Sequence, residues 1–231
     1  MKVYIDRRKV HSRAAAANSA SVSGLLVLLV SVAIPLFLPR SASFSWLLSI
    51  GGAAISMIGI YLANRWVRKP RPEDSLDRAL KAFDDRHQLF HYPALPCDHI
   101  LLTPAGVLAM EVVNLPGRFS HQGGHWKESM TMGRALRYIV EPRVGDPVLF
   151  AKTTAQELQD RFLPVVGADA VVPIRALMVF THPAVVLDTS GASIPACKIE
   201  KLRKQAVINS AGLAPDTYEK LSSYLERETT T

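Results

Sequence analysis

Residues 98–117 read DHILLTPAGVLAMEVVNLPG, which is two apolar runs separated by the turn sequence TPAG. Proline suits the second position of a type I turn, and glycine suits the fourth. A turn of this kind between two apolar runs predicts a hairpin of two antiparallel β-strands. The hairpin also carries two acids, Asp98 at its start and Glu111 near its end, within a mostly apolar sequence.

The register of this hairpin decides whether the two acids meet. If Thr103 pairs with Gly106, Asp98 faces Glu111 on the adjacent strand, with Cβ atoms about 5 Å apart. Two carboxylates in this position repel each other unless a divalent cation lies between them. If Gly106 instead adopts the left-handed conformation in a three-residue loop, Asp98 faces Val112. The apolar pattern leaves both registers open, and spacing alone favours a buried hairpin with two acids at its solvated end.

The N-terminal part of the chain has the composition of a membrane anchor. No charged residue occurs in residues 14–39 or in residues 41–64. Each stretch is long enough to cross a hydrocarbon core of about 30 Å as a helix, which takes roughly 20 residues. We therefore expect two spans, at residues 22–39 and 44–66, joined as a tight transmembrane helical hairpin.

The net charge of +7 is concentrated in this region. Residues 1–72 contain ten Lys or Arg and one acid, whereas the remainder contains 17 basic and 19 acidic residues. Basic residues precede the first span and follow the second: Lys2, Arg7, Arg8, Lys9, Arg13, Arg65, Arg68, Lys69 and Arg71. The positive-inside rule then predicts a multi-pass protein of the cell membrane, with both termini and the globular domain in the cytoplasm. A signal peptide is the alternative, but the apolar region is too long for one and a second span follows.

These features divide the chain into four parts. We expect a basic cytoplasmic N-terminus at residues 1–21, the transmembrane hairpin at 22–66, a linker at 67–73 and a globular domain at 74–231. Within the second span, the residues that recur every four positions predict a packing face: Ser45, Ser49 and Ala53. In the globular domain, apolar patterns predict helices at 73–90, 147–162, 199–209 and 215–227, and strands at 174–180, 185–187 and 194–197.

Two pairs of histidines lie close together in the sequence, and the spacing of the first pair can hold a metal. His87 and His91 lie four residues apart near the end of a predicted helix, but no third ligand lies nearby in the sequence. His121 and His125 flank the turn of a second predicted hairpin and could meet across its strands. Packed or solvated histidines are the favoured interpretation for both pairs.

The cysteines and the C-terminal basic residues also receive structural interpretations. Cys97 and Cys197 lack CxxC spacing, so in a cytosolic domain we expect them to be reduced. A basic patch is expected to be a solvated helix face, with phosphates or an anionic membrane surface as alternative ligands. It consists of Lys198, Lys201, Arg203 and Lys204.

A series of short motifs follows in a fixed order along the globular domain. The matching residues are Asp98, Gly106, Glu111, Asn114, Gly117 and Trp126, and a similar Asp146-Pro147 pair follows them at the start of a predicted helix. In this order they resemble the nuclease-related domain (NERD) family, over residues 74–205. The resemblance implies a restriction-endonuclease-like α/β fold, in which helices flank a mixed central sheet. It also implies a D…ExK site in which Asp98 and Glu111 bind Mg²⁺ or Mn²⁺, with a nucleic acid as the partner.

Two positions depart from the family pattern. Val113 stands where the family has the ExK lysine, which stabilises charge on the scissile phosphate or helps to activate water. Phe150 stands where the family tends to have glutamine. Loss of a positioned cation is expected to cost much of the rate, unless Lys127 or Lys152 replaces it from a neighbouring element.

These observations support two hypotheses. The first is a membrane-anchored protein of nucleic-acid processing or binding with weak or lost phosphodiesterase activity. In it, Asp98 and Glu111 are catalytic or vestigial metal ligands. The second is a non-catalytic, membrane-tethered binding or scaffold domain, whose protein partner the sequence does not identify.

Overall fold

The structure, a computed structural model, describes residues 1–38, 42–122, 125–129, 144–167, 170–188, 194–208 and 212–230. The chain divides into two compact units. The first unit comprises residues 1–6 and the described residues from Pro72 onward, and is called the sheet domain below. The second unit comprises residues 7–71 and is called the hairpin.

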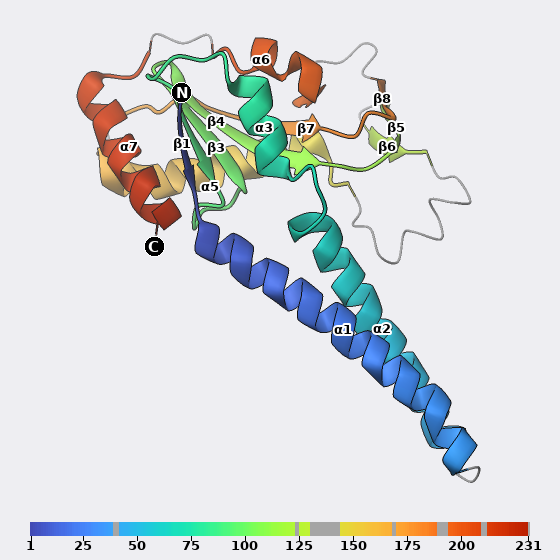
Figure 1. Ribbon diagram of the computed structural model, residues 1–231. Coiled ribbons are helices and arrows are strands. Elements are labelled where there is room, and N and C mark those ends of the chain that lie inside the picture. The colour runs from blue at the N-terminus through green and yellow to red at the C-terminus, as the bar shows by residue number, and fades with distance from the viewer. Residues whose placement is uncertain are drawn as a thin grey trace. The chain divides into compact units, whose positions relative to one another are not determined.

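A six-stranded sheet forms the centre of the sheet domain (Figure 1). In spatial order its strands are β1 (Lys2–Ile5), β2 (Gln88–His91), β3 (His99–Thr103), β4 (Gly106–Val113), β7 (Ile174–Phe180) and β9 (Ala196–Lys198). All strands run parallel except β3, which is antiparallel to both of its neighbours. The carboxyl ends of the parallel strands therefore meet at one edge of the sheet, together with the start of β3. We call this the carboxyl edge.

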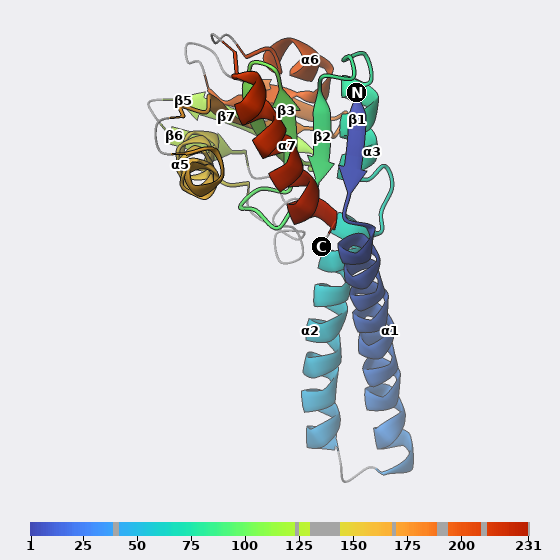
Figure 2. The same ribbon diagram turned by 90° about the vertical axis from the view of Figure 1, so that its left-hand side faces the viewer.

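Helices cover both faces of this sheet (Figures 1 and 2). On one face, α5 (Pro147–Val166) and α7 (Pro215–Thr230) bury Leu158, Phe162, Leu221 and Leu225 against the strands. On the other face, α3 (Pro72–Leu80) and α6 (Leu202–Gln205) bury Leu76, Leu80 and Leu202. A short 3₁₀ turn, η2 (Ile199–Lys201), precedes α6. A mixed sheet with helices on both faces confirms the predicted α/β class.

The predicted elements are recovered with some changes of length. The strand at 174–180 is confirmed as β7, and α5 begins where expected, because the Asp146 carboxylate accepts hydrogen bonds from the amides of Val148 (2.8 Å) and Leu149 (3.3 Å). The helix predicted at 73–90 is shorter, since α3 ends at Leu80 and residues 88–91 form β2. The helix predicted at 199–209 is limited to η2 and α6.

A second, smaller sheet lies beyond the end of β4. Its strands are β6 (His125–Glu128), β5 (Gly117–Gln122) and β8 (Val185–Asp188), in that spatial order. The predicted hairpin of residues 117–128 is thus confirmed as β5 and β6. Phe119, Trp126 and Phe180 form an aromatic cluster between this small sheet and β7, with the Phe119 and Trp126 rings stacked at 5.8 Å.

The first residues of the chain form β1, an edge strand that the sequence analysis did not expect. β1 pairs in parallel with β2 (Figure 2), and the Lys2 amide donates to the His87 carbonyl at 3.1 Å. The Tyr4 ring stacks on Phe90 at 4.9 Å. The hairpin is therefore an insertion between β1 and α3 of the sheet domain. The predicted division into an N-terminal region at 1–21 and a globular domain at 74–231 differs from the observed units for this reason.

The hairpin consists of two long apolar helices, α1 (Arg7–Phe37) and α2 (Ala42–Trp66). Both are long and apolar enough to cross a membrane, and only 11% of the most apolar 18-residue stretch of each helix is buried. The core helix of a soluble protein would bury far more of this surface. The two predicted spans lie within these helices, so the coarse prediction of a membrane-associated hairpin agrees with the structure.

Small residues line the seam between α1 and α2. A Cβ atom added at Gly24 would lie 2.5 Å from the Ser56 amide nitrogen, and one added at Gly59 would lie 2.5 Å from that of Ser21. Backbones approach this closely only where glycine leaves room, as in other membrane helix pairs. Substitution of either glycine would force the two helices apart.

The predicted packing face of the second span is correct at two of its three positions. The Ser45 hydroxyl donates to the Ser31 carbonyl, and the Ser49 hydroxyl donates to the Ser31 hydroxyl at 2.9 Å. Ala53 instead is exposed, and the seam continues through Gly52. A step of four residues exceeds the 3.6-residue helical turn, so a strict four-residue repeat drifts off the contact face.

Candidate functional site

The β3–β4 register brings the two candidate acids toward each other. Thr103 pairs with Gly106, and the ladder runs to His99 opposite Met110. Asp98 lies in the bend directly before β3, and Glu111 follows Met110 on β4, so both acids lie at this end of the hairpin. The predicted two-residue connection is therefore confirmed, and the alternative register with Asp98 opposite Val112 is wrong.

The turn itself explains why this register is chosen. The Thr103 hydroxyl donates to the Gly106 carbonyl at 2.9 Å and accepts a hydrogen bond from the Ala105 amide at 3.1 Å. Gly106 has φ +145°, and a Cβ there would collide with the carbonyl oxygen of Pro173. Only glycine meets both requirements, so its position fixes the end of β3 and the start of β4.

Both acids lie at the carboxyl edge, and Glu111 points to the sheet face that α5 and α7 cover. Glu111 shares the strand parity of Ala109, which is buried in that core. Burial raises the pKa of the Cys97 thiol well above its ordinary value, and the charges of Asp98 and Glu111 raise it further. Both carboxylates thus lie near one buried thiol and are themselves only half-buried. Their position fits a shared cation that keeps water ligands.

The two cysteines are free and buried, as predicted for reduced structural residues. Burial raises the pKa of Cys197 to about 12. Since the thiolate is the reactive form, neither thiol has the character of a nucleophile at neutral pH.

The protein groups available to a cation at this point are few. Within the described ranges, no cluster of three or more His, Cys, Asp or Glu side chains has the arrangement of a metal site. Zinc sites use three or four such ligands, whereas Mg²⁺ is held by one or two carboxylates and several waters. The acid pair therefore fits a cation that prefers oxygen ligands, such as Mg²⁺ or Mn²⁺, better than Zn²⁺.

The position of the missing lysine is closed. Val113 is 8% exposed and packs in an apolar cluster with Phe119 and Phe180. Phe150, the second departure from the family pattern, packs against the same cluster from α5. The two departures are thus neighbours in space, and together they fill with apolar atoms the region beside Glu111.

The two lysines considered as replacements are exposed at other places. Lys127 lies on β6 of the small sheet, opposite Ser120. Lys152 lies two residues after Phe150 on α5, and two residues rotate a helical position by about 200°. Since Phe150 faces the core, Lys152 faces away from it. Neither lysine has the position of the ExK cation.

A buried polar network that the sequence analysis missed lies on the opposite face of the sheet. His91 Nδ1 is 2.8 Å from His99 Nδ1, and His91 Nε2 is 3.0 Å from a carboxylate oxygen of Asp77. The Tyr92 hydroxyl donates to the Glu73 carboxylate at 2.8 Å. The backbone of Tyr92 has a positive φ of 61°. Asp77 and Glu73 belong to α3, so this network fixes α3 to the carboxyl edge. No spacing in the sequence signals it, because its parts come from three separate elements.

His87 and His91 do not form a ligand pair. His91 binds Asp77 and His99, whereas His87 lies 2.6 Å from an oxygen of Asp84. In the second hairpin His121 pairs with Trp126 rather than with His125, whose side chain lies outside the described part of the structure. The favoured structural interpretation therefore agrees with the geometry of His87 and His91.

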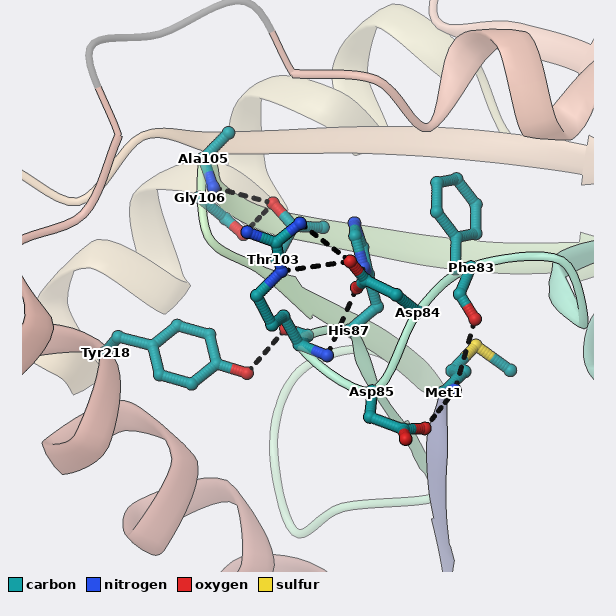
Figure 3. A network of polar contacts seen from close by, with 10 residues as sticks. Met1, Phe83, Asp84, Asp85, His87, Thr103, Ala105, Gly106 and Tyr218 are labelled. Atoms are coloured by element: carbon teal, nitrogen blue, oxygen red, sulfur yellow. Dashed lines mark hydrogen bonds and ion pairs between the residues drawn. The ribbon is translucent and has the colours of Figure 1, made fainter.

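Figure 3 shows the polar contacts around His87, at the amino end of β2. The Asp84 carboxylate accepts hydrogen bonds from His87 and from Arg86 Nε, the latter at 2.9 Å. These hydrogen bonds lower the pKa of Asp84 to about 2, and the bond from Arg86 has the larger effect. The Tyr218 hydroxyl donates to the Arg86 carbonyl at 2.7 Å. The amino group of Met1 donates to the Phe83 carbonyl at 3.1 Å. These contacts tie β1 and α7 to the turn before β2, so their role is structural.

Comparison of the chain with protein-family models, with curated proteins and with solved structures found no match. The resemblance to the nuclease-related family therefore stays a prediction from the motifs of the chain.

Proposed function

We propose that this chain is a membrane-anchored protein with a nuclease-related sheet domain, which binds a divalent cation and has weak or no phosphodiesterase activity. The observation that supports it most is the β3–β4 register, which brings Asp98, in the bend before β3, and Glu111, on β4, to the same end of the hairpin beside the Cys97 thiol. Two carboxylates held close together repel each other. Mg²⁺ or Mn²⁺ between the carboxylates would remove that repulsion.

The residues around the acid pair limit the chemistry. A bound cation would supply Lewis-acid polarisation of a phosphate oxygen. Asp98 and Glu111 would hold it, and their half-exposed position would leave room for water and a phosphate. Val113, however, offers only methyl groups where a positive side chain would stabilise developing charge. Nucleic acid is the proposed ligand, bound without efficient cleavage.

A specific observation favours the second hypothesis of a non-catalytic binding or scaffold domain. Val113 and Phe150 belong to one packed apolar cluster, so the catalytic position is filled rather than vacant. A filled position stabilises the fold and no longer needs to be open to a substrate. In this alternative Asp98 and Glu111 are vestigial, and the domain acts through a partner.

Cleavage assays on the full chain separate these possibilities. We expect no robust cleavage of single-stranded or double-stranded DNA or RNA with Mg²⁺ or Mn²⁺. The matched control is Glu111→Gln, which keeps the shape of the side chain and removes its charge. Any residual cleavage that is a property of the site disappears in this variant, whereas cleavage by a contaminating nuclease persists. Strong cleavage by the natural chain that Glu111→Gln abolishes would contradict the proposal of impaired chemistry.

The proposed location is the cell membrane, with both termini and the sheet domain in the cytoplasm. The chain leaves the sheet domain after Asp6 and re-enters it at Pro72, so both flanks of the hairpin belong to one folded unit. Both flanks are also basic, as expected for the cytoplasmic side. A reporter fused after Thr231 is expected to be active only when it requires the cytoplasm. Activity of a reporter that requires the opposite side would exclude this topology.

A further inference from the structure

One end of the hairpin carries a group of exposed cations at a common level. The pairs Ser21–Gly59 and Gly24–Ser56 show that α1 and α2 are antiparallel, with opposite residue numbers that add to about 80. The same relation sets Arg13 opposite residue 67. The exposed cations within about one turn of this level form what we call the cation cluster: Arg13, Arg65, Arg68 and Lys69.

The length of the hairpin sets the depth of this cluster in a bilayer. From Arg13 to the end of α1 at Phe37 the helix rises about 36 Å, at 1.5 Å per residue. A hydrocarbon core is about 30 Å thick, and a bilayer with its headgroups is about 40–45 Å thick. If the turn of the hairpin reaches the far interface, the cluster lies at the depth of the near headgroups. Trp66 lies at the same level, where its buried side chain has the Arg65 guanidinium 5.7 Å from its ring centre.

The hairpin contains no acidic residue that could neutralise these cations from within. Residues 7–71 include no Asp or Glu. Counter-charge therefore comes from outside this unit, and at headgroup depth phosphate is an abundant anion. Each cation near the membrane surface attracts an anionic leaflet by about 1 kcal/mol, whether it is Arg or Lys.

We propose that the cation cluster is a binding site for the phosphate groups of anionic phospholipids. It selects lipids with a net negative headgroup, such as phosphatidylglycerol, over zwitterionic phosphatidylcholine, whose choline group opposes the approach of a cation. The proposal depends on the placement of the hairpin in a membrane and is independent of the acid pair at Asp98 and Glu111.

The test uses the full chain in micelles that contain an equimolar mixture of the two lipids. Native mass spectrometry then counts the lipids that stay bound after the chain is released from the micelles. We expect phosphatidylglycerol to be retained about tenfold more than phosphatidylcholine. Replacement of all four cluster residues by Gln is expected to remove this preference. Replacement of the three arginines by Lys is expected to retain most of it, which shows that charge rather than shape is needed.

A control with the same change in net charge tests whether position matters. Gln at Lys198, Lys201, Arg203 and Lys204, which lie in the sheet domain, is expected to leave the preference unchanged. Inorganic phosphate added in excess is expected not to displace the lipid, because it lacks the acyl chains. Equal retention of the two lipids by the natural chain would overturn the proposal. Equal loss of preference in the control, or displacement by inorganic phosphate, would also overturn it.

Discussion

Val113→Lys is expected to destabilise the sheet domain by about 3 kcal/mol or more and to restore little phosphodiester cleavage. Val113 is 8% exposed and packs with Phe119 and Phe180. A lysine there must either bury an ammonium group, deprotonate, or push the aromatic cluster apart, and each route costs free energy. Urea unfolding of the full chain in micelles measures the loss, followed by the fluorescence of Trp126 with Trp46 and Trp66 replaced by Phe.

The matched control for this substitution is Val186→Lys. Val186 lies on β8 of the neighbouring small sheet and is 47% exposed, so the ammonium group stays in water. We expect a change in unfolding free energy within about 0.5 kcal/mol. A Val113→Lys variant of unchanged stability would contradict the burial argument. Cleavage gained in it and lost again on addition of Glu111→Gln would show that the lysine alone was missing.

Removal of residues 1–71 is expected to prevent stable folding of the sheet domain. The truncation deletes β1, which leaves the edge of β2 unpaired and uncovers Phe90, on which Tyr4 stacks at 4.9 Å. Burial of a whole apolar side chain contributes about 1.5–3 kcal/mol. The summed free energy lost from several partly buried side chains is therefore comparable to the stability of a whole domain. Circular dichroism and hydrogen exchange of the truncated chain measure this loss.

The control separates loss of β1 from loss of the membrane anchor. A chain in which a short Gly/Ser linker replaces residues 7–71 keeps β1 and is expected to fold in solution. The linker can be short, since the Asp6 amide donates to the His91 carbonyl and Glu73 binds the adjacent Tyr92. Within this soluble form, Tyr4→Pro is expected to cost about 2–3 kcal/mol. Val3→Pro is expected to cost less, because Val3 is 43% exposed on the edge strand and its amide points away from β2. Equal stability of the truncated and linked forms would show that β1 is dispensable.

Local sequence signals predicted those parts of the fold whose determinants lie close together in the chain. The TPAG turn with flanking apolar runs predicted β3 and β4, and Asp146-Pro147 predicted the start of α5. β1 was not predicted, because a four-residue strand shows little pattern and its partner, β2, lies more than 80 residues away. β2 was assigned to a helix for a similar reason, since its burial depends on neighbours that the sequence alone does not identify.

The candidate site was predictable to the same extent. The two acids and their possible opposition followed from the hairpin, but the choice of register depended on Gly106 and its contact with Pro173, a residue far along the chain. The burial of Val113 beside Phe180 also depended on a distant strand. The contact between His91 and His99 could not be predicted, because it requires the pairing of β2 with β3.

The most direct test of the account is calorimetric titration of the full chain in micelles with Mn²⁺ and with Mg²⁺. We expect one cation to bind per chain, and binding to be lost in both Asp98→Asn and Glu111→Gln. Asp146→Asn serves as the control, since Asp146 caps α5 and belongs to no acid pair, and it is expected to retain binding. Absence of binding to the natural chain, or binding that survives both substitutions, would contradict a cation site between Asp98 and Glu111.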